Sequence, residues 1–351
     1  ESFLSLGVIF DTLRDWNKLR RFGSSYRNTI SKGGGEDGII WPLISSSWES
    51  STRGKYAISN ALYTNLFDSA IKSLPKQKTA IYLQENVGWE FGFIQAWKAY
   101  AHGKAIGWPH AAVRYWDLRY YFAPEEFSDQ SIYVLPRPDY VATSGPLDKQ
   151  NLIDSGYPKE ELLDAEALRF MHLNSYREKL HSKPSTQQDG LNLLVIGDIS
   201  ERSTRFLIDL LERSAKDLPN NLNVTIKFHP ACVLALNEYK EIEFKVTNSP
   251  ISSLLPISNL ALTGNLTSAG IEAYCAGLEL ITTLNPIGLN LSPLRGVEDV
   301  HFIGSKKELV SAIWFISDKK SVKNDRRASD FFFLDPTLKS WKNLILNSNK
   351  D

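Results

Sequence analysis

The feature that most constrains the fold of this chain is an alternation of short β-prone runs with helical segments, which occurs twice along its 351 residues. Strand and helix in alternation indicate a parallel sheet, because a parallel strand needs a crossover, usually a helix, before the next strand. Hydrophobic runs and turn signals predict first-half strands at 79–84, 104–108 and 139–145 and a helix at 88–102. In the second half they predict strands at 191–197, 223–228, 259–263 and 279–284 and helices at 203–218 and 268–276.

Length and polar stretches predict how these elements divide into domains. A chain of 351 residues is too long for one ordinary core and suits two. Residues 158–190 are charged and polar, and 185–190 has the composition of a linker. We therefore predict an α/β protein with a first domain at 1–188 and a second at 189–325. The amphipathic segment within 326–351 is expected to form a helix that returns to the first domain.

Composition narrows the class of protein. Hydrophobic residues make up 42% and charged residues 23%, as in globular proteins, and forty basic residues balance forty acidic ones, so nothing favours a nucleic-acid partner. No apolar run approaches the roughly 20 residues of a membrane helix, and the first residues lack the basic region of a signal peptide. Two cysteines, Cys232 and Cys275, suit buried thiols in a reducing cytoplasm better than a disulfide framework.

The strongest local signal is the run Thr-Gly-Asn-Leu-Thr-Ser-Ala-Gly-Ile-Glu-Ala at 263–273. A strand ends, a glycine permits a tight turn, and Thr267 and Ser268 fall at the start of a helix. Free N–H groups and two hydroxyls there predict a phosphate site, and Glu272 lies one helical turn on, where it could accept hydrogen bonds from a ribose. The alternative is an ordinary Ser/Thr helix cap.

Two further candidates follow strands of the second half. In Lys227-Phe228-His229-Pro230, alternation puts Lys227 and His229 on one face, and Pro230 ends the strand. His229 would then lie at the carboxyl edge, where it can donate to a phosphate oxygen, although a lone histidine is more often structural. Asp198 follows the first strand and would lie beside it, unless it merely caps the next helix.

The first half offers a carboxylate and a histidine at equivalent places. Glu85 ends one predicted strand and His110 follows the next, so both are expected at the same sheet edge, facing the second domain. Glu85 could exchange a proton with an acceptor hydroxyl. Glu90 lies one or two turns into the following helix, either near the acceptor or as a partner within its helix.

Several motifs are missing from the sequence. It contains no Asp-x-Asp pair, no His-Glu-x-x-His, no P-loop and no Gly-x-Gly-x-x-Gly, which removes support for metal-diphosphate, zinc-hydrolase, NTPase and dinucleotide sites. We therefore predict no metal and no cofactor. The charge of a leaving phosphate would be met by His229, Lys227 and the helix start.

Four stretches resemble bacterial surface-carbohydrate biosynthesis proteins that are similar to the retaining β-Kdo transferases of lipopolysaccharide and capsule assembly. They are Tyr-Leu-Gln-Glu-Asn-Val-Gly-Trp-Glu from Tyr82, Ile-Gly-Trp-Pro-His from Ile106, Asp-Leu-Arg-Tyr-Tyr from Asp117, and Phe-Phe-Leu-Asp-Pro-Thr-Leu-Lys-Ser-Trp from Phe332. The resemblance implies a GT-B fold, in which two Rossmann-like domains face a cleft and the C-terminal helix packs back on the first domain.

The resemblance also implies an activity and a set of roles. The donor would be a CMP-activated ulosonic acid such as Kdo, transferred with retention by double displacement to a glycan or glycolipid acceptor. Asp198 would be the nucleophile and Glu85 the acid/base. Lys227, His229, Thr267 and Ser268 would bind CMP. A cytoplasmic protein follows, with peripheral contact to the inner face of the inner membrane and to other glycosyltransferase modules as further expectations.

Three alternatives stay open at this point. A nucleotide-sugar 2-epimerase shares the GT-B architecture and needs carboxylates and histidines in the same cleft. A CDP-linked polyol-phosphate transferase would use the same phosphate site. A non-catalytic GT-B module could act as a scaffold for other assembly enzymes, although intact candidates at Glu85, Asp198, His229 and Ser268 argue against decay.

Overall fold

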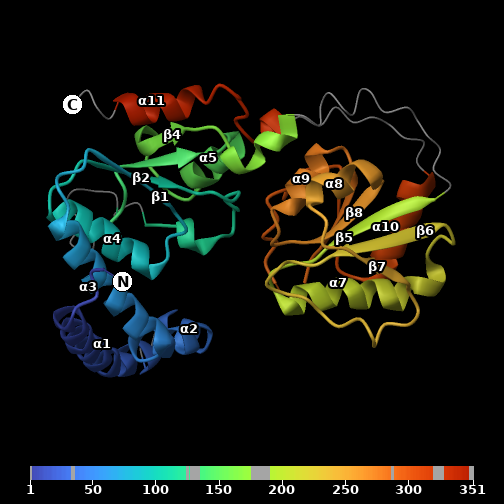
Figure 1. Cartoon of the computed structure of the whole chain (residues 1–351). Coiled ribbons are helices and arrows are strands. Elements are labelled where there is room, and N and C mark those ends of the chain that lie inside the picture. The colour runs from blue at the N-terminus through green and yellow to red at the C-terminus, as the bar shows by residue number, and fades with distance from the viewer. Residues whose placement is uncertain are drawn as a thin grey trace.

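The computed structural model describes residues 2–32, 36–123, 126, 135–174, 190–285, 288–318 and 328–347. Two parallel β-sheets form the centres of two domains, one from each half of the chain (Figure 1). The predicted boundaries at 188/189 and at 325/326 fall outside the described residues, as does the predicted linker at 185–190 apart from its last residue, Gly190.

The first sheet has four parallel strands in the order β1-β2-β3-β4. These strands are β1 (Thr79–Leu83), β2 (Lys104–Trp108), β3 (Tyr140–Thr143) and β4 (Leu162–Asp164). Two crossovers contain α4 (Gly88–Ala99) and α5 (Pro146–Asp154). Ala105 packs with Trp97 of α4, whereas its neighbour Ile106 packs on the opposite face with Trp341. Both faces are therefore covered, as expected of a parallel sheet.

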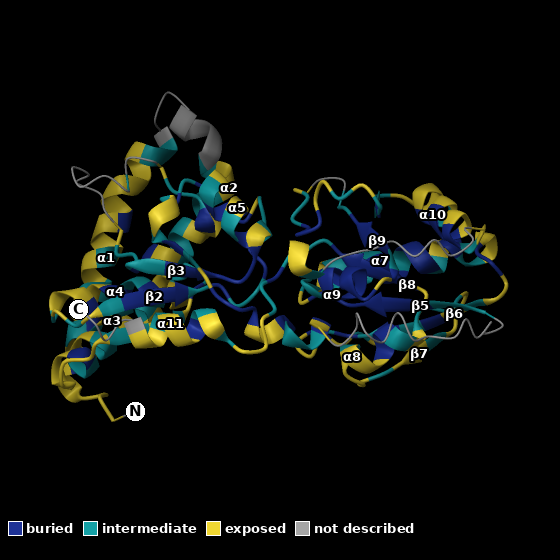
Figure 2. Ribbon diagram, turned by 90° about the horizontal axis from the view of Figure 1, so that it is seen from above, coloured by how far each residue is buried: buried dark blue, intermediate teal, exposed yellow. Residues whose placement is uncertain are grey.

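Three helices that the sequence patterns do not predict precede this sheet. They are α1 (Leu6–Lys32), α2 (Glu36–Thr52) and α3 (Lys55–Ser73). α3 contacts both α1 and α4, and its Ile71 packs against Trp97. Much of α1 is exposed (Figure 2), and its exposed side chains include Leu6 and Phe10. Apolar residues on both sides of α1 leave no single hydrophobic stripe, which is why periodicity does not reveal this helix.

The second sheet has six parallel strands in the order β10-β9-β8-β5-β6-β7. They are β5 (Leu191–Ile196), β6 (Leu222–Lys227), β7 (Phe244–Val246), β8 (Leu260–Gly264), β9 (Glu279–Thr283) and β10 (Val300–Ile303). Its helices are α7 (Glu201–Ser214), α8 (Ile251–Leu254), α9 (Ala269–Cys275) and α10 (Lys306–Asp318). Leu193 and Val195 of β5 face the core under α7 and α10, and Leu194 and Ile196 face the core under α9.

The strand order reverses at β5, which lies between β8 and β6. In an open α/β sheet, ligands gather at the carboxyl ends of the strands beside such a switch point. The loop after β5 begins with Gly197 and Asp198. The fold therefore puts Asp198 where a doubly wound sheet usually binds its ligand.

The end of the chain returns to the first domain. Helix α11 (Lys339–Asn347) lies against the first sheet, and its Trp341 packs edge-to-face on Trp108 with the ring centroids 5.2 Å apart (Figure 1). The Glu166 carboxylate accepts the N–H groups of Ser340 (2.7 Å) and Trp341 (3.0 Å) and so caps this helix. Two Rossmann-like domains and a returning helix confirm the predicted GT-B fold class.

Short 3₁₀ segments complete the described structure. They are η1 (Leu118–Tyr120), η3 (Lys159–Glu161), η4 (Leu168–Leu173), η5 (Ala215–Asp217), η6 (Leu255–Ile257) and η7 (Ala328–Asp330). Within the described ranges, no helix combines the length and the apolar character needed to span a bilayer.

Candidate functional site

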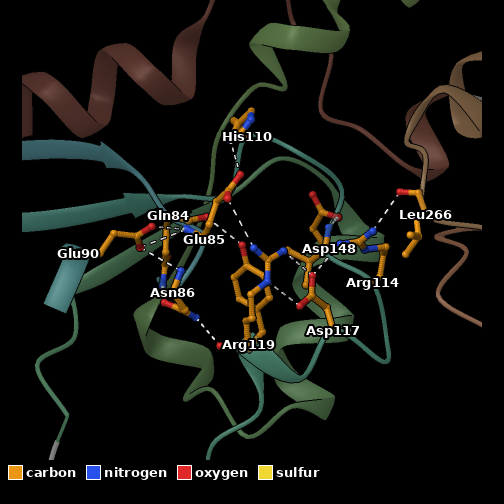
Figure 3. A network of polar contacts seen from close by, with 12 residues as sticks. Gln84, Glu85, Asn86, Glu90, His110, Arg114, Asp117, Arg119, Asp148 and Leu266 are labelled. Carbon is orange, nitrogen blue, oxygen red and sulfur yellow. Dashed lines mark hydrogen bonds and ion pairs between the residues drawn. The ribbon is translucent and has the colours of Figure 1, made fainter. Parts of the chain in front are cut away.

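The turn after β1 is built around Glu90. Its carboxylate, only 1% exposed, accepts the backbone N–H of Glu85 (3.0 and 3.1 Å) and of Asn86 (2.9 Å) (Figure 3). Asn86 adopts a left-handed conformation with φ of 53°, which asparagine tolerates better than most residues. Burial raises the pKa of Glu90, against the opposing effect of these N–H groups. Glu90 therefore shapes the turn that presents Glu85, and its own carboxylate faces inward.

Glu85 and His110 meet at the carboxyl edge of the first sheet. Because β1 and β2 are parallel neighbours, the residues that follow them lie side by side. Glu85 Oε1 is 3.9 Å from His110 Nδ1, and Glu85 Oε2 is 3.5 Å from Arg119 Nη1. The Glu85 side chain is 45% exposed, so it remains accessible to a ligand.

Asp117 joins two arginines in the loop beyond His110. Its Oδ2 accepts from Arg114 Nη2 (2.9 Å) and from Arg119 Nη2 (2.8 Å), while Oδ1 accepts from Arg119 Nε (2.9 Å). Burial alone would raise the pKa of Asp117, but the two guanidinium groups outweigh it and hold the pKa below its usual value. The aspartate is therefore ionised at neutral pH.

Arg114 also reaches the second domain. Its Nη1 donates to the carbonyl oxygen of Leu266 at 3.0 Å, in the loop between β8 and α9 (Figure 3). Nearby, the Arg295 guanidinium of the second domain lies 4.0 Å from the ring centroid of Tyr115. The carboxyl ends of the two sheets therefore meet at this junction.

Asp198 lies on the second-domain side of the junction. It is 1% exposed, and its Oδ1 accepts the N–H of Ser200 at 3.1 Å, while Oδ2 has no hydrogen-bond partner among the described residues. Burial raises the pKa of Asp198, although backbone N–H dipoles, including that of Leu266, and the charge of Arg114 act in the opposite direction. A Cβ added at Gly264 would lie 2.8 Å from Asp198 Oδ2, so glycine leaves the room that this carboxyl needs.

Lys227 and His229 lie at the end of β6, with Phe228 between them buried in the core. His229 Nδ1 accepts the N–H of Ala231 at 3.1 Å. A neutral imidazole whose Nδ1 accepts carries its proton on Nε2, so Nε2 can donate to an anion.

The start of α9 differs from the predicted arrangement in one respect. Thr267 Oγ1 accepts the N–H of Ala269 at 3.2 Å and so caps the helix, whereas the Ser268 side chain makes no capping bond. Glu272 is 6% exposed and lies 3.0 Å from His172 Nε2 in η4. Burial raises the pKa of Glu272 while His172 opposes that rise. The predicted ribose contact thus already has a protein partner.

Asp148 in α5 holds the loop that carries Arg114. Its Oδ1 accepts the N–H of Val113 at 2.8 Å, and Asn151 Nδ2 donates to the Val113 carbonyl at 2.7 Å. Asp148 is 1% exposed, and burial raises its pKa to about 8. Asp148 therefore fixes the backbone of the loop that carries Arg114, while its own side chain stays buried in the first domain.

A cavity of about 360 Å³ lies elsewhere, beside the residues that precede β3. Lys98, Arg137, Asp139 and Glu161 line it, and Lys98 and Asp139 are paired at 3.5 Å. It opens at the amino edge of the first sheet, the edge opposite Glu85 and His110. Among the described residues, no three histidine, cysteine, aspartate or glutamate side chains gather as a metal site would require.

Sequence reasoning did not identify the residues that connect the two domains. Arg114, Asp117 and Arg119 come from one loop, Arg-Tyr-Trp-Asp-Leu-Arg, which directly follows His110. A dense run of charge after a strand end was the signal that could have drawn attention to them. His172 gave no such signal, because it lies in the short 3₁₀ segment η4 between the two sheets and does not follow a predicted strand.

No family model matches this chain, and no curated protein matches it. Solved structures do match it. The UDP-GlcNAc 2-epimerase of Methanocaldococcus jannaschii is 13% identical, with a TM-score of 0.51 over 85% of this chain and 84% of that one. The Neisseria meningitidis UDP-GlcNAc 2-epimerase bound to UDP-GlcNAc is 14% identical, with a TM-score of 0.52 over 83% and 82%. The S. aureus MnaA structure with UDP is 12% identical, with a TM-score of 0.53 over 83% and 80%. At this identity the similarity establishes the shared fold.

These comparisons correct the prediction of a Kdo transferase. Several of these similar structures are UDP-GlcNAc 2-epimerases, and three of them contain UDP, UDP-GlcNAc or both. The predictions of a retaining glycosyltransferase, a CMP-linked ulosonic acid donor, a glycan acceptor and partner modules are therefore wrong. The motifs misled because short sequences at strand ends recur in a fold that serves several reactions on nucleotide sugars.

Proposed function

We propose that the protein is a nucleotide-sugar 2-epimerase that acts on a UDP-linked N-acetylhexosamine. One observation carries the proposal: acidic side chains from both domains, Asp198 and Glu85, lie at the ends of one chain of contacts across the domain junction. The fold is one that UDP-GlcNAc 2-epimerases share over more than four fifths of both chains. The function is thus inferred from the site within a matching fold.

The chemistry of this reaction requires two proton-handling groups. Inversion at C2 begins when a base removes the C2 proton. The electron pair of that C–H bond forms a C1–C2 double bond, while the C1–O bond breaks and UDP leaves with its electron pair. In the return step the diphosphate oxygen attacks C1 and a proton is delivered to C2 from the other face. The two steps return a proton to C2 and the diphosphate to C1 with no net oxidation or reduction. The route therefore needs no redox cofactor.

Asp198 and Glu85 fit these two roles from opposite sides. Burial raises the pKa of Asp198, and this direction favours the protonated carboxyl that a proton donor needs. Glu85 is 45% exposed and lies 3.5 Å from Arg119 Nη1, which orients its side chain. We assign Asp198 as the acid and Glu85 as the base in one direction, with the roles exchanged in the other.

The nucleotide would bind on the second domain. His229 offers its Nε2–H to a phosphate oxygen, and Lys227, the last residue of β6, lies two residues before it. Thr267 and Ser268 lie in the neighbouring loop, at the start of α9. This half of the proposal assigns UDP to the edge of the sheet where Asp198 is found.

We further propose a cytoplasmic location. Both cysteines, Cys232 and Cys275, are free and buried, which suits a reducing compartment.

The direct test is interconversion of UDP-GlcNAc and UDP-ManNAc, followed by chromatography. We expect the protein to form each from the other, and we expect Asp198→Asn to lower the rate by about 10²–10⁴-fold. The matched control is Asp217→Asn, an exposed aspartate at the amino side of β6, which should retain full activity. A protein that binds UDP-GlcNAc but forms no UDP-ManNAc would overturn the proposal.

A further inference from the structure

Asp117 is a carboxylate shared by two arginines, Arg114 and Arg119, which extend from it toward different domains. Arg114 continues from Asp117 to the Leu266 carbonyl in the second domain, at 3.0 Å. Arg119 continues from Asp117 to Glu85 in the first domain, at 3.5 Å. Asp117 is 9% exposed, whereas the Arg114 and Arg119 side chains are 21% and 40% exposed, so the carboxylate is the most shielded member of this chain of contacts.

The second-domain end of this chain lies close to Asp198. Leu266 accepts from Arg114 through its carbonyl, and its N–H dipole acts on the Asp198 carboxyl. The charge of Arg114 itself also stabilises ionised Asp198. A displacement of Arg114 would therefore change both the contact between the domains and the surroundings of Asp198.

The first-domain end controls Glu85. The backbone of Glu85 is fixed by Glu90, but its side chain is 45% exposed and is directed only by Arg119 and His110. Arg119 is in turn held by two hydrogen bonds to Asp117, at 2.8 and 2.9 Å. This paired geometry fixes the plane of the Arg119 guanidinium and hence the direction from which it meets Glu85.

We propose that Asp117 is a positioning residue that sets the approach of the two domains through Arg114 and the orientation of Glu85 through Arg119. Its effect on turnover rests on the proposed 2-epimerase function, whereas its effect on the domains does not. Without this carboxylate, two guanidinium groups would face each other with no shared counter-charge. Arg114 would then leave Leu266, and Arg119 would no longer direct Glu85.

The domain part is tested without any ligand. Double electron–electron resonance measures the distance between two spin labels, one in each domain. The labels are attached at Lys72→Cys in α3 and Lys216→Cys in η5, two positions that are exposed in the native protein. Cys232 and Cys275 are buried and stay in place. We expect Asp117→Ala to broaden this distance distribution and Arg114→Ala to do the same. The matched control is Asp15→Ala, which removes an aspartate that also contacts two cations, Arg14 and Lys18, but lies in α1.

The double variant separates positioning from general loss of structure. If Asp117 acts on the domains through Arg114, adding Asp117→Ala to Arg114→Ala should broaden the distribution no further. Should Asp117→Ala fail to fold, Arg114→Ala alone still tests the contact. A distribution unchanged in both single variants, with native thermal unfolding, would overturn the domain part.

The Glu85 part is tested by kinetics. Arg119→Ala and Asp117→Ala should each lower kcat for UDP-GlcNAc epimerisation at least about tenfold. In Arg119→Ala the KM should stay near the native value, because Arg114 and the second domain are untouched. An unchanged kcat in both variants of an active enzyme would overturn this part. A native protein without epimerase activity would instead overturn the proposed function and leave the distance measurement as a separate test.

Discussion

Asp148 shows how one buried carboxyl group can serve a site that it does not touch. It holds the N–H of Val113, one residue before Arg114, and it is fully enclosed by the first domain. Burial raises its pKa to about 8, so the neutral carboxyl is the stable form in the folded protein at neutral pH. The unfolded chain ionises this group near the ordinary value of 3.8.

This difference predicts how stability depends on pH. The folded state keeps the proton that the unfolded state loses, so the contribution of Asp148 is greatest below pH 3.8 and declines as pH rises toward about 8. Asp148→Asn keeps the acceptor for Val113 and cannot ionise. We expect the free energy of unfolding of this variant to exceed that of the native protein by at least about 1 kcal/mol between about pH 5 and pH 9.

Urea denaturation across that pH range measures the effect, with Asp217→Asn as an exposed control. A constant stability difference between Asp148→Asn and the native protein at every pH would show that this carboxyl does not titrate as described.

Sequence could predict a residue of the site where a strand determines its position. Glu85 and His110 were expected together because they follow adjacent parallel strands, and the structure brings them to 3.9 Å. Arg114 could not be predicted in the same way. It lies in a loop without periodicity, and its partner Leu266 is 152 residues away in the other domain. A contact between domains depends on how they pack, which local patterns do not encode.

At the scale of elements, α11 is held to the first domain by a charged cap. Glu166 accepts the first N–H groups of the helix, and Trp341 Nε1 donates to the Glu166 carbonyl at 2.8 Å. Burial opposes ionisation of Glu166, but the N–H donors outweigh it and lower its pKa. The ionised cap therefore stabilises the fold above pH 4.5 and weakens as pH falls through the lowered pKa.

Glu166→Gln should remove the charge and one of the two acceptors. We expect the free energy of unfolding to fall by about 1–2 kcal/mol at neutral pH, because the N-terminus of α11 then lacks its carboxylate. Thermal unfolding at about pH 7 and at a series of lower pH values checks this, since the native protein also loses the charge as pH falls through the lowered pKa of Glu166. A difference that persists unchanged at low pH would contradict a charged cap.

Elements with continuous apolar runs were predictable, and short or two-sided ones were not. The run at 191–197 became β5 and the run at 104–108 became β2 with nearly the same bounds. β4 and β7 have only three residues each and form by pairing with a longer neighbour. Such strands depend on tertiary contacts, which a single sequence does not reveal.

At the scale of the whole molecule, the two domains divide the proposed work. The second domain provides Asp198 and the nucleotide residues, and the first provides Glu85, His110 and Arg114. The sequence pattern predicted two α/β halves with a returning helix, and the resemblance to known proteins implied the GT-B fold. The reaction was not predictable, because the same architecture supports both sugar transfer and epimerisation.

This division predicts selective stabilisation by nucleotides. UDP should raise the unfolding temperature by several degrees at saturation, since a ligand at about 100 times its Kd adds roughly 2.7 kcal/mol. CMP at the same concentration should have a smaller effect, and His229→Ala should weaken the effect of UDP. Thermal shift with both nucleotides provides the measurement. A larger shift with CMP than with UDP would contradict the assignment of UDP.

In the proposed reaction, carboxyl groups from the two domains exchange a proton with C2 of one UDP-linked sugar. Proton NMR of UDP-GlcNAc incubated with the protein in D₂O follows that atom directly. We expect the C2 proton signal to disappear as deuterium replaces the proton at C2, at least as fast as UDP-ManNAc forms. We also expect Glu85→Gln and Asp198→Asn each to suppress the exchange. If UDP-GlcNAc binds and keeps its C2 proton throughout, the proposed removal of that proton is contradicted.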